Sequence, residues 1–250
     1  MELSDFVTVI VPFTYSQQQL DTQIAVYMDI LSGVGLPKPQ IVSANNKSQE
    51  DIACEVAEIV GEDRSVSISP KHYIAAFCYN DGETAFVTFD SHRDYYITMH
   101  PTFGNGSFLR YRNGEIYIVG SDMEFIGPNP PKQIKVYPPK KIDRVIQADI
   151  PPKIFLSLDI DVFDEEVTKA HNWPHDGLVE RFERAIGIKT HLSFEEVLTL
   201  SQQLLQGRTL MGVNIAEYCP QLEQPPYKTA ELLKQYLRAV LHAGVPLQAH

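Results

Sequence analysis

The chain of 250 residues is long enough for one large α/β domain, and its 44% hydrophobic and 21% charged residues are typical of a globular protein. A formal net charge of −11 disfavours non-specific binding to nucleic acid or to an anionic membrane surface, because the long-range field repels both. The three cysteines (Cys54, Cys78 and Cys219) are far apart, and no stretch approaches the ~18 apolar residues of a membrane span. We therefore expect a cytoplasmic protein with free thiols.

Short strand-like segments alternate with segments of helical periodicity along the chain. The segments expected as strands are residues 6–12, 40–43, 66–69, 85–89, 115–119, 135–137, 154–158 and 210–215. The segments expected as helices are residues 17–31, 48–60, 72–79, 176–186, 193–206 and 229–242. Ser48 is a plausible helix cap, and Ser193 begins a capping box with Glu196. This alternation predicts a single domain over residues 1–250, built on a doubly wound, mainly parallel sheet with helices on both faces.

Ionisable side chains follow four of the expected strands. They are Asp90, His92 and Asp94 after strand 85–89, Asp159 and Asp161 after strand 154–158, Glu217 after strand 210–215, and His72 after strand 66–69. Ligands of open parallel sheets bind beyond the carboxyl ends of the strands, so these side chains are expected to lie together. In extended backbone, alternate residues also point the same way, which would let the members of each segment converge.

Such a convergence of carboxylates predicts bound cations. Four carboxylates brought together without a cation would raise one another's pKa values and destabilise the fold, and two divalent ions would remove that repulsion. Four aspartates and two histidines suit Mn²⁺ better than a thiolate-preferring metal, although other divalent ions are an alternative. Either segment alone is compatible with aspartates that only cap a strand end. Two such segments, each directly after a buried type of strand, favour a binuclear metal site.

These segments resemble motifs of the ureohydrolase family, which includes arginase, agmatinase, guanidinobutyrase and formimidoylglutamase. FDSHRDYY is similar to the family's DAHxD segment, SLDIDVFDE to SxDxDxxDP, and NIAEYCP to DIVEVNP, within residues 66–220. The resemblance implies a three-layer α/β/α fold and a centre that holds two Mn²⁺ ions. The implied metal ligands are His72, Asp90, His92, Asp94, Asp159 and Asp161.

The resemblance also implies a reaction, the hydrolysis of a C–N bond in a small cationic guanidino or amidino compound. Two ions about 3.5–4 Å apart would share a water and lower its pKa, and the resulting hydroxide would attack the amidino carbon. Asp94 would receive the proton, and Glu217 would hold the amidino group. The family's usual assembly implies a homo-oligomer, either a trimer or a hexamer, with no nucleic-acid or membrane partner.

Two loops depart from the family pattern. The family commonly has a histidine after DAHxD that protonates the leaving amine, whereas the matching residue here is Asn105, which cannot transfer a proton at neutral pH. His100 is a candidate substitute for this histidine, and Asn105 and Ser107 are candidate substrate-binding residues. In residues 169–173, where the family has small side chains, Asn172 is a further candidate for substrate contact.

Three functions remain compatible with the sequence. The first is a Mn²⁺-dependent amidinohydrolase acting on a guanidino or formimidoyl compound. The second is a non-catalytic or diverged relative that keeps the metal site, an alternative that Asn105 favours. The third is a metal-dependent deacetylase or another amide hydrolase of related fold, which the two complete ligand segments disfavour because such enzymes usually hold one metal.

Overall fold

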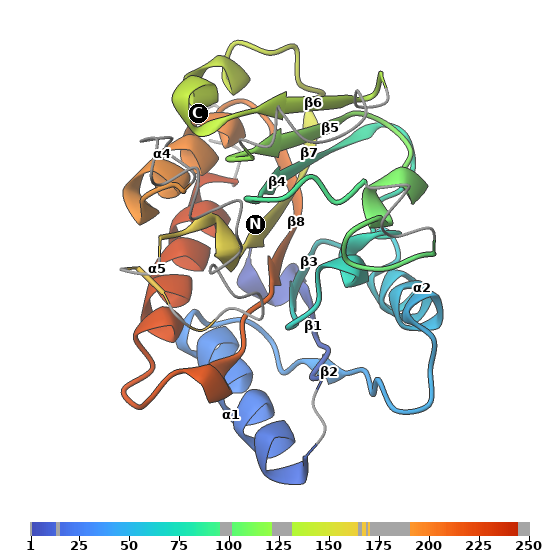
Figure 1. Cartoon of the computed structure of the whole chain (residues 1–250), viewed down its shortest axis with the longest axis vertical. Coiled ribbons are helices and arrows are strands. Elements are labelled where there is room, and N and C mark those ends of the chain that lie inside the picture. The colour runs from blue at the N-terminus through green and yellow to red at the C-terminus, as the bar shows by residue number, and fades with distance from the viewer. Residues whose placement is uncertain are drawn as a thin grey trace, which may run out of the picture.

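Eight strands form one sheet through the middle of the molecule (Figure 1). The computed structural model describes residues 2–13, 16–95, 102–121, 132–164, 167–168, 170 and 191–244. The strands are β1 (Val7–Ile10), β2 (Gln40–Ile41), β3 (Ser65–Ile68), β4 (Thr84–Phe89), β5 (Ile116–Val119), β6 (Ile134–Tyr137), β7 (Lys153–Asp159) and β8 (Thr209–Ala216). Their order is β2-β1-β3-β8-β7-β4-β5-β6, and each pair of neighbours is parallel, which confirms the expected sheet.

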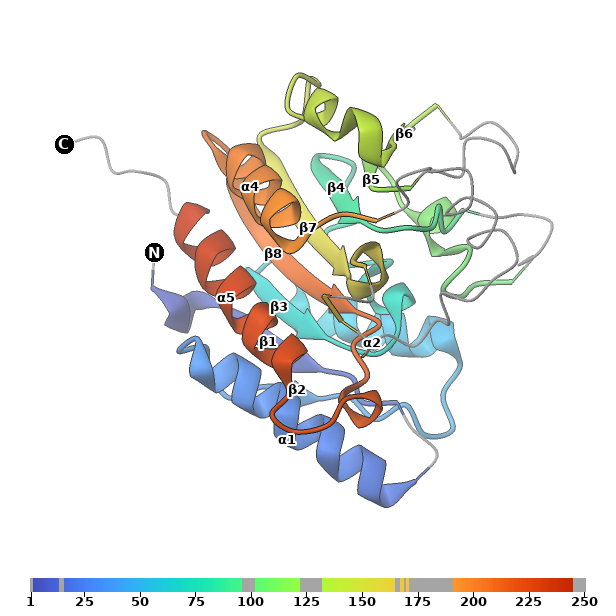
Figure 2. The ribbon, with the colours of Figure 1, turned by 60° about the vertical axis from the view of Figure 1, so that its left-hand side comes forward.

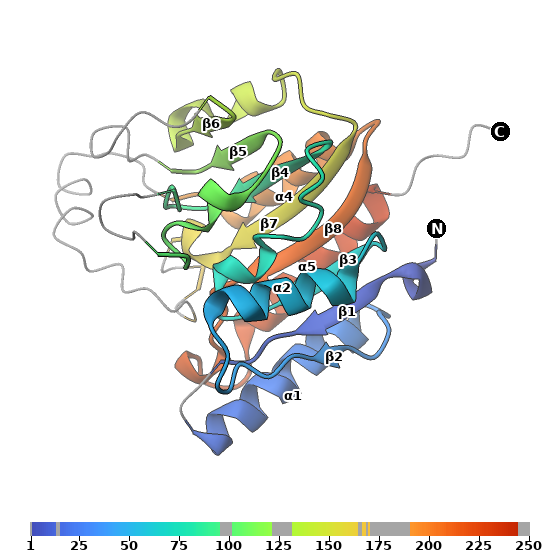
Figure 3. The same ribbon diagram turned by 90° about the vertical axis from the view of Figure 1, so that its right-hand side faces the viewer.

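Helices cover both faces of this sheet. Helices α1 (Gln17–Gly33), α4 (Phe194–Leu205) and α5 (Lys228–Ala243) lie over one face (Figure 2), and α2 (Gln49–Val60) lies over the other (Figure 3). Successive side chains of β4 enter different cores: Val87 packs in the core with α1, α4 and α5, and Phe86 in the core with α2. This alternation is the normal consequence of strand geometry. The expected three-layer α/β/α fold is therefore confirmed.

Short 3-10 helices and side-chain caps complete the local structure. The 3-10 helices are η1 (Leu3–Asp5), η2 (His72–Ala75), η3 (Phe108–Tyr111), η4 (Pro139–Val145), η5 (Ile160–Val162) and η6 (Pro220–Leu222). Ser48 and Ser193 cap α2 and α4 as expected, each within a capping box. The helix expected over residues 176–186 lies outside the described residues. No helix in the described ranges is long and apolar enough to cross a membrane.

The expected helix over residues 72–79 is wrong, because only the single 3-10 turn η2 forms there. The buried guanidinium of Arg112 gives the physical reason. It donates hydrogen bonds to the carbonyl oxygens of Ala75 (2.6 Å), Ala76 (2.9 Å) and Cys78 (3.0 Å). These carbonyls therefore accept from a distant side chain instead of from the amides one turn further on, as a continuing α-helix would require. Arg112 thereby fixes the segment that follows His72.

Candidate metal centre

The four central strands of the sheet end at the candidate ligands. Strands β3, β8, β7 and β4 are neighbours in that order, although they come from distant parts of the sequence. The register pairs Phe89 with Leu158 and Asp159 with Ala216. Asp90 and Asp159 therefore leave the sheet side by side, and Glu217 leaves it next to Asp159. Parallel pairing thus brings the carboxyl ends of all four strands to one place.

The ligand segments converge through turns, not through extended backbone, which corrects the simple alternation argument. Asp90 Oδ1 accepts a hydrogen bond from the main-chain N–H of His92 (2.6 Å), and Asp94 has a φ of +41°. Asp159 Oδ1 likewise accepts from the main-chain N–H of Asp161 (3.1 Å), which lies in η5. Each aspartate at a strand end therefore folds the following residues back toward itself. A positive φ at a non-glycine residue such as Asp94 is uncommon and is typical of functional sites.

The first half of the cluster surrounds His72. The imidazole Nδ1 of His72 lies 3.3 Å from Asp90 Oδ2, 3.0 Å from Asp94 Oδ2 and 3.0 Å from Asp159 Oδ2. The His72 side chain is fully buried, and its Nδ1 makes no well-aligned hydrogen bond with any described residue. One N–H proton can point at only one of these oxygens, whereas a cation among the four atoms would contact all of them.

The spacing of these atoms fits a divalent cation. Ligand atoms ~2.1 Å from an octahedral ion lie about 3.0 Å from one another, which is close to the distances around His72 Nδ1. Asp90 Oδ2 is also buried without a hydrogen-bond partner among the described residues, so a second ligand atom of the same group is left unsatisfied. Buried polar atoms are normally paired, so two such atoms beside one another are suited to binding a cation.

The second half of the cluster surrounds His92. Its Nδ1 lies 2.6 Å from Asp161 Oδ2 and 3.8 Å from Asp90 Oδ1. Asp90 therefore faces both histidines, and ligand atoms of Asp90, His92 and Asp161 lie within 4.8 Å of one another. The His92 side chain is 24% exposed, so this half opens toward solvent while the half around His72 is closed. The structure thus brings together all six residues that the sequence predicts as ligands.

Burial and neighbouring charges shift the pKa values of the side chains in the cluster. Burial alone would lower the pKa of His72, but the carboxylates of Asp159, Asp90 and Asp94 raise it well above its usual value. Burial, followed by the charge of Asp94, raises the pKa of Asp90 to about 7. Burial and the charge of Asp161 likewise raise the pKa of Asp159. These shifts follow from crowding several anions into a buried space, and a divalent cation would reverse them.

A network of buried polar side chains on the sheet holds the His72 imidazole in place. Its Nε2 lies 3.0 Å from Ser157 Oγ, which also accepts a hydrogen bond from Asn214 Nδ2 (3.0 Å). Ser67 Oγ in turn donates to Asn214 Oδ1 (2.9 Å). These residues lie on β7, β8 and β3, so the sheet itself carries the support. With Ser157 accepting from Nε2–H, the lone pair of His72 Nδ1 is directed at the cluster, as a metal ligand requires.

Replacing Ser157 with alanine is expected to weaken Mn²⁺ binding by about 10–100-fold, because the partner that orients the His72 ring is lost. Isothermal titration of Mn²⁺ into the metal-free protein measures this change. Ser201→Ala is the matched control, since Ser201 is equally buried and hydrogen-bonded to Val197 O and Tyr236 Oη in a distant helix layer. Equal Mn²⁺ affinities for the two variants would contradict the orienting role.

Glu217 completes the cluster on the side of β8. Ligand atoms of Glu217, Asp159 and Asp161 lie within 4.8 Å of one another, and the Glu217 backbone has a φ of +61°. Burial, followed by the charge of Asp159, raises the pKa of Glu217 well above its usual value. Glu217 Oε1 accepts a hydrogen bond from Asn105 Nδ2 at 2.7 Å. The predicted substrate-side residues Glu217 and Asn105 therefore lie together at the cluster.

The remaining predicted residues lie elsewhere or outside the described residues. Ser107 is fully buried, and its hydroxyl donates to the carbonyl oxygen of Thr102 (2.6 Å), so its side chain stabilises its own loop instead of facing the cluster. His100 and Asn172 lie outside the described residues. Sequence reasoning missed the supporting residues Ser157 and Asn214. The available signal was a polar side chain within a strand that otherwise reads as fully buried, because a buried polar group requires a partner.

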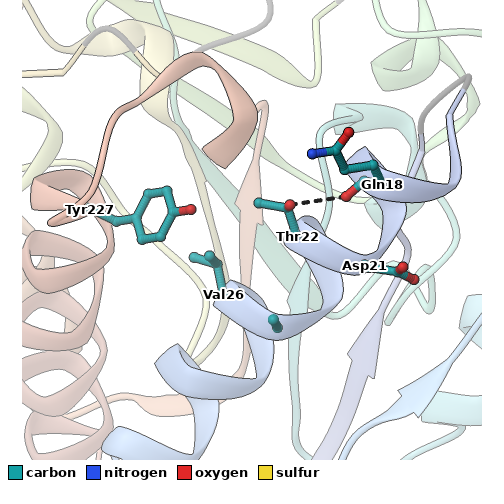
Figure 4. Close-up of a pocket in the computed structure, with 6 residues that line it drawn as sticks. Gln18, Asp21, Thr22, Val26 and Tyr227 are labelled. Carbon is teal, nitrogen blue, oxygen red and sulfur yellow. Dashed lines mark hydrogen bonds between the residues drawn. The ribbon is translucent and has the colours of Figure 1, made fainter.

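A hollow on the molecular surface is a separate feature (Figure 4). It is lined by Gln18, Asp21, Thr22, Ala25, Val26 and Tyr227. None of these residues belongs to the cluster. The Thr22 hydroxyl donates to the carbonyl oxygen of Gln18 (3.0 Å), and Asp21 accepts from Gln17 Nε2 (2.8 Å). The side chains of Thr22 and Asp21 therefore form hydrogen bonds within helix α1 instead of pointing to a separate reactive site.

Comparison with known proteins gives matches in structure but none in sequence. No protein-family model matches the sequence, and no curated protein shows significant sequence similarity to it. The structure resembles an agmatine ureohydrolase from Thermoplasma volcanium, with a TM-score of 0.71 and 16% identity over 96% of this chain and 90% of the other. An arginase from Bacillus subtilis matches with a TM-score of 0.65 and 16% identity over 96% and 99%. A formimidoylglutamase from Bacillus subtilis matches with a TM-score of 0.64 and 14% identity over 99% and 89%.

An all-parallel sheet in this strand order, with histidines and aspartates gathered at its central carboxyl ends, defines a protein of the arginase-like α/β class. The chain has the fold of the ureohydrolases, a group of hydrolases, as its sequence motifs predict. At these low identities the likeness is one of fold, and the site geometry carries the argument about function.

Proposed function

We propose that this chain is a ureohydrolase family member that uses two divalent ions to hydrolyse a C–N bond of a small guanidino or amidino compound. The observation that carries this proposal is the arrangement of three carboxylate oxygens 3.0–3.3 Å from the buried Nδ1 of His72. No described element other than the ends of the four central strands places histidines and aspartates in such an arrangement. We further propose a single domain over residues 1–250 and assembly as a trimer or hexamer.

The two halves of the cluster would hold one ion each. The first ion would take His72, Asp90, Asp94 and Asp159 as ligands. The second would take His92, Asp90, Asp159 and Asp161. This set is rich in carboxylate oxygens and contains two imidazoles, which suits Mn²⁺ better than a thiolate-preferring metal, and other divalent ions remain possible.

The protein's own groups would then position the substrate and move a proton. A bound pair of divalent ions would supply Lewis acidity and would lower the pKa of a water bound at the cluster. Asp94, at the edge of the cluster, is placed to accept the proton of that water. Glu217, on the far side of Asp159, is placed to hold a cationic amidino group through charge-assisted hydrogen bonds. Addition of the water oxygen to the amidino carbon would form a C–O bond. The C–N bond would then break, and the amine would leave with the proton taken up by Asp94 or with one from solvent, leaving urea or the corresponding amide.

The buried carboxylate of Glu217 favours this hydrolase over a non-catalytic relative. A relative that only bound metal would need the six ligand residues, but it would not need a further buried carboxylate beside Asp159 and Asp161. Asn105 cannot protonate the leaving amine, and the loss of general acid assistance is worth roughly 10²–10⁴-fold in rate. We therefore expect slow turnover unless His100, which we propose as the substitute acid, serves in its place.

Metal analysis combined with a substrate panel tests the proposal. The purified protein is expected to hold two divalent ions per chain, measured by elemental analysis after loading with Mn²⁺ and gel filtration. Urea or ammonia release is then measured with arginine, agmatine, guanidinobutyrate and formimidoylglutamate. Turnover of at least one compound is expected, and it should disappear on chelation. Absence of bound metal would refute the proposed centre, whereas bound metal without any turnover would favour the non-catalytic alternative.

A further inference from the structure

Asn105 connects two parts of the candidate centre that are distant in sequence. Its Oδ1 accepts hydrogen bonds from the main-chain N–H groups of His72 (3.0 Å) and Tyr73 (3.3 Å). Its Nδ2 donates to Glu217 Oε1 (2.7 Å). The loop that carries Asn105 thus lies between the turn after β3 and the end of β8. Both ends of one short amide are used, and each end contacts a different part of the site.

The partners fix the orientation of this amide. Two N–H groups face its oxygen, and a carboxylate oxygen faces its NH₂ group. The reversed amide would place donors against donors and an oxygen against a carboxylate, so only one orientation satisfies the contacts. A side chain in this position must therefore offer an acceptor on one side and a donor on the other.

On the side of the candidate metal ligands, Asn105 caps η2 by accepting hydrogen bonds from its first N–H groups. The first N–H groups of a helical turn have no partner within the turn itself. The residue before η2, Lys71, provides no side-chain cap. Asn105 accepts from the N–H groups of His72 and Tyr73 and so holds the backbone from which the His72 imidazole enters the cluster. A displacement of this turn would move Nδ1 away from Asp90, Asp94 and Asp159.

On the substrate side, Asn105 holds a carboxylate that its surroundings repel. Glu217 is buried beside Asp159 and Asp161, and its backbone has a positive φ that is uncommon for a residue with a side chain. Like charges at this distance push the Glu217 carboxylate away from the cluster. The N–H donor of Asn105 opposes this repulsion and directs Oε1.

We propose that Asn105 is a positioning residue that clamps the His72 turn to Glu217 and so sets the metal-binding half of the site against the carboxylate that would hold the substrate. The role of Glu217 in this inference rests on the proposed function, whereas the link between Asn105 and His72 does not. The position at which the sequence resemblance places a proton donor is thus filled by a group with a different task. Proton transfer to the leaving group falls to another residue or to solvent.

A Mn²⁺ titration of the metal-free protein tests the metal side. Asn105→Ala is expected to bind Mn²⁺ about 10–100-fold more weakly than the unsubstituted protein, as is typical when a group that orients a metal ligand is lost. Asn80→Ala is the matched control, because Asn80 also uses both ends of its amide, accepting from the Asn113 N–H and donating to the Tyr111 carbonyl oxygen, and it lies just before β4, outside the cluster. Its Mn²⁺ affinity should be unchanged. Circular dichroism before titration establishes that each variant is folded.

A donor–acceptor exchange tests the link to Glu217. Asn105→Asp keeps an acceptor for the two N–H groups but sets a carboxylate against Glu217, so the melting temperature of the metal-free protein at pH 8 should fall. Combining it with Glu217→Gln reverses donor and acceptor and restores a hydrogen bond. The double variant should therefore melt above the temperature obtained by adding the two single shifts. This measurement also serves if Asn105→Ala fails to fold.

The two outcomes separate this inference from the proposed function. An Asn105→Ala variant that binds Mn²⁺ within about threefold of the unsubstituted protein would overturn the clamp, and so would additive melting shifts in the exchange experiment. Neither measurement uses a substrate. If every compound of the panel is inert while both expected results are obtained, the proposed function fails and the clamp stands.

Discussion

Replacing Asp159 with asparagine is expected to abolish detectable turnover and to remove tight Mn²⁺ binding. Asp159 Oδ2 lies 3.0 Å from His72 Nδ1, and Asp159 also groups with Asp161 and Glu217, so it faces both halves of the cluster. Metal ions in such sites contribute several kcal/mol of transition-state stabilisation, which corresponds to a rate loss of about 10³-fold or more. Turnover with added Mn²⁺ and a Mn²⁺ titration measure the two effects.

The exposed Asp143 provides the control for this change. Asp143→Asn removes the same charge from the protein surface and should leave both Mn²⁺ affinity and turnover unaltered. If Asp159→Asn behaved like Asp143→Asn in both assays, the metal centre would have to lie elsewhere. A variant that kept its affinity for Mn²⁺ but lost turnover would instead limit Asp159 to a role in catalysis.

The metal-free protein is expected to become less stable as the pH rises from about 5 to 8. The pKa of Asp90 is raised from 3.8 to about 7, so between these values the native state holds a proton that the unfolded chain has released. Stability falls with pH wherever the native state binds more protons. The pKa values of His72 and His92 are also raised, so the stability that they contribute is complete below about 6.5 and is lost as the pH rises through the raised values. Both contributions have the same sign.

Thermal melting with a chelator and with Mn²⁺ measures this dependence. The melting temperature in chelator should fall by several degrees between pH 5 and 8, and Asp90→Asn, which removes one crowded charge, should reduce that fall. Free Mn²⁺ at 1,000 times its Kd should add about 4 kcal/mol, or ~8–16 °C for a chain of this size. The gain should be largest at pH 8, where the ligands are deprotonated. A flat profile in chelator would contradict the crowding of charges.

The strands and the placement of the candidate ligand residues at the strand ends could be predicted from the sequence because both depend on local patterns. The apolar run of residues 85–89 identifies a buried strand, and Asp90 directly after it must leave the sheet at its carboxyl end. The alternation of an extended backbone was an incomplete reason to expect Asp94 close to Asp90. A turn with a positive φ at Asp94 brings it there. The length of the turn at His72 could not be predicted, because Arg112, a residue 40 positions later, determines it.

The role of Asn105 could not be predicted for a related reason. A sequence motif assigns a position to a residue, but the partners of that residue depend on how distant loops pack. The hydrogen bond from Asn105 to Glu217 spans 112 residues, and the one from His72 spans 33. The side chains of Ser157 and Asn214 meet only because β7 and β8 pair in one register. These contacts depend on the tertiary structure. In the sequence, the signal that indicates them is a polar residue within an otherwise apolar strand.

The strand order has a consequence for how the molecule assembles. Strands β2, β1 and β3 come from the first 68 residues and β4, β5 and β6 from residues 84–137, so the two sets occupy opposite sides of the sheet. Strands β7 and β8 come later in the chain and lie between them, so the facing edges of β3 and β4 can pair only once β7 and β8 are in place. The cluster of histidines and aspartates lies at the junction between these two sets of strands. We expect bound Mn²⁺ to stabilise the pairing of β7 and β8 with β3 and β4. Pulse-labelling hydrogen exchange should show the facing edges of β3 and β4 gaining protection last, and gaining it sooner when Mn²⁺ is present.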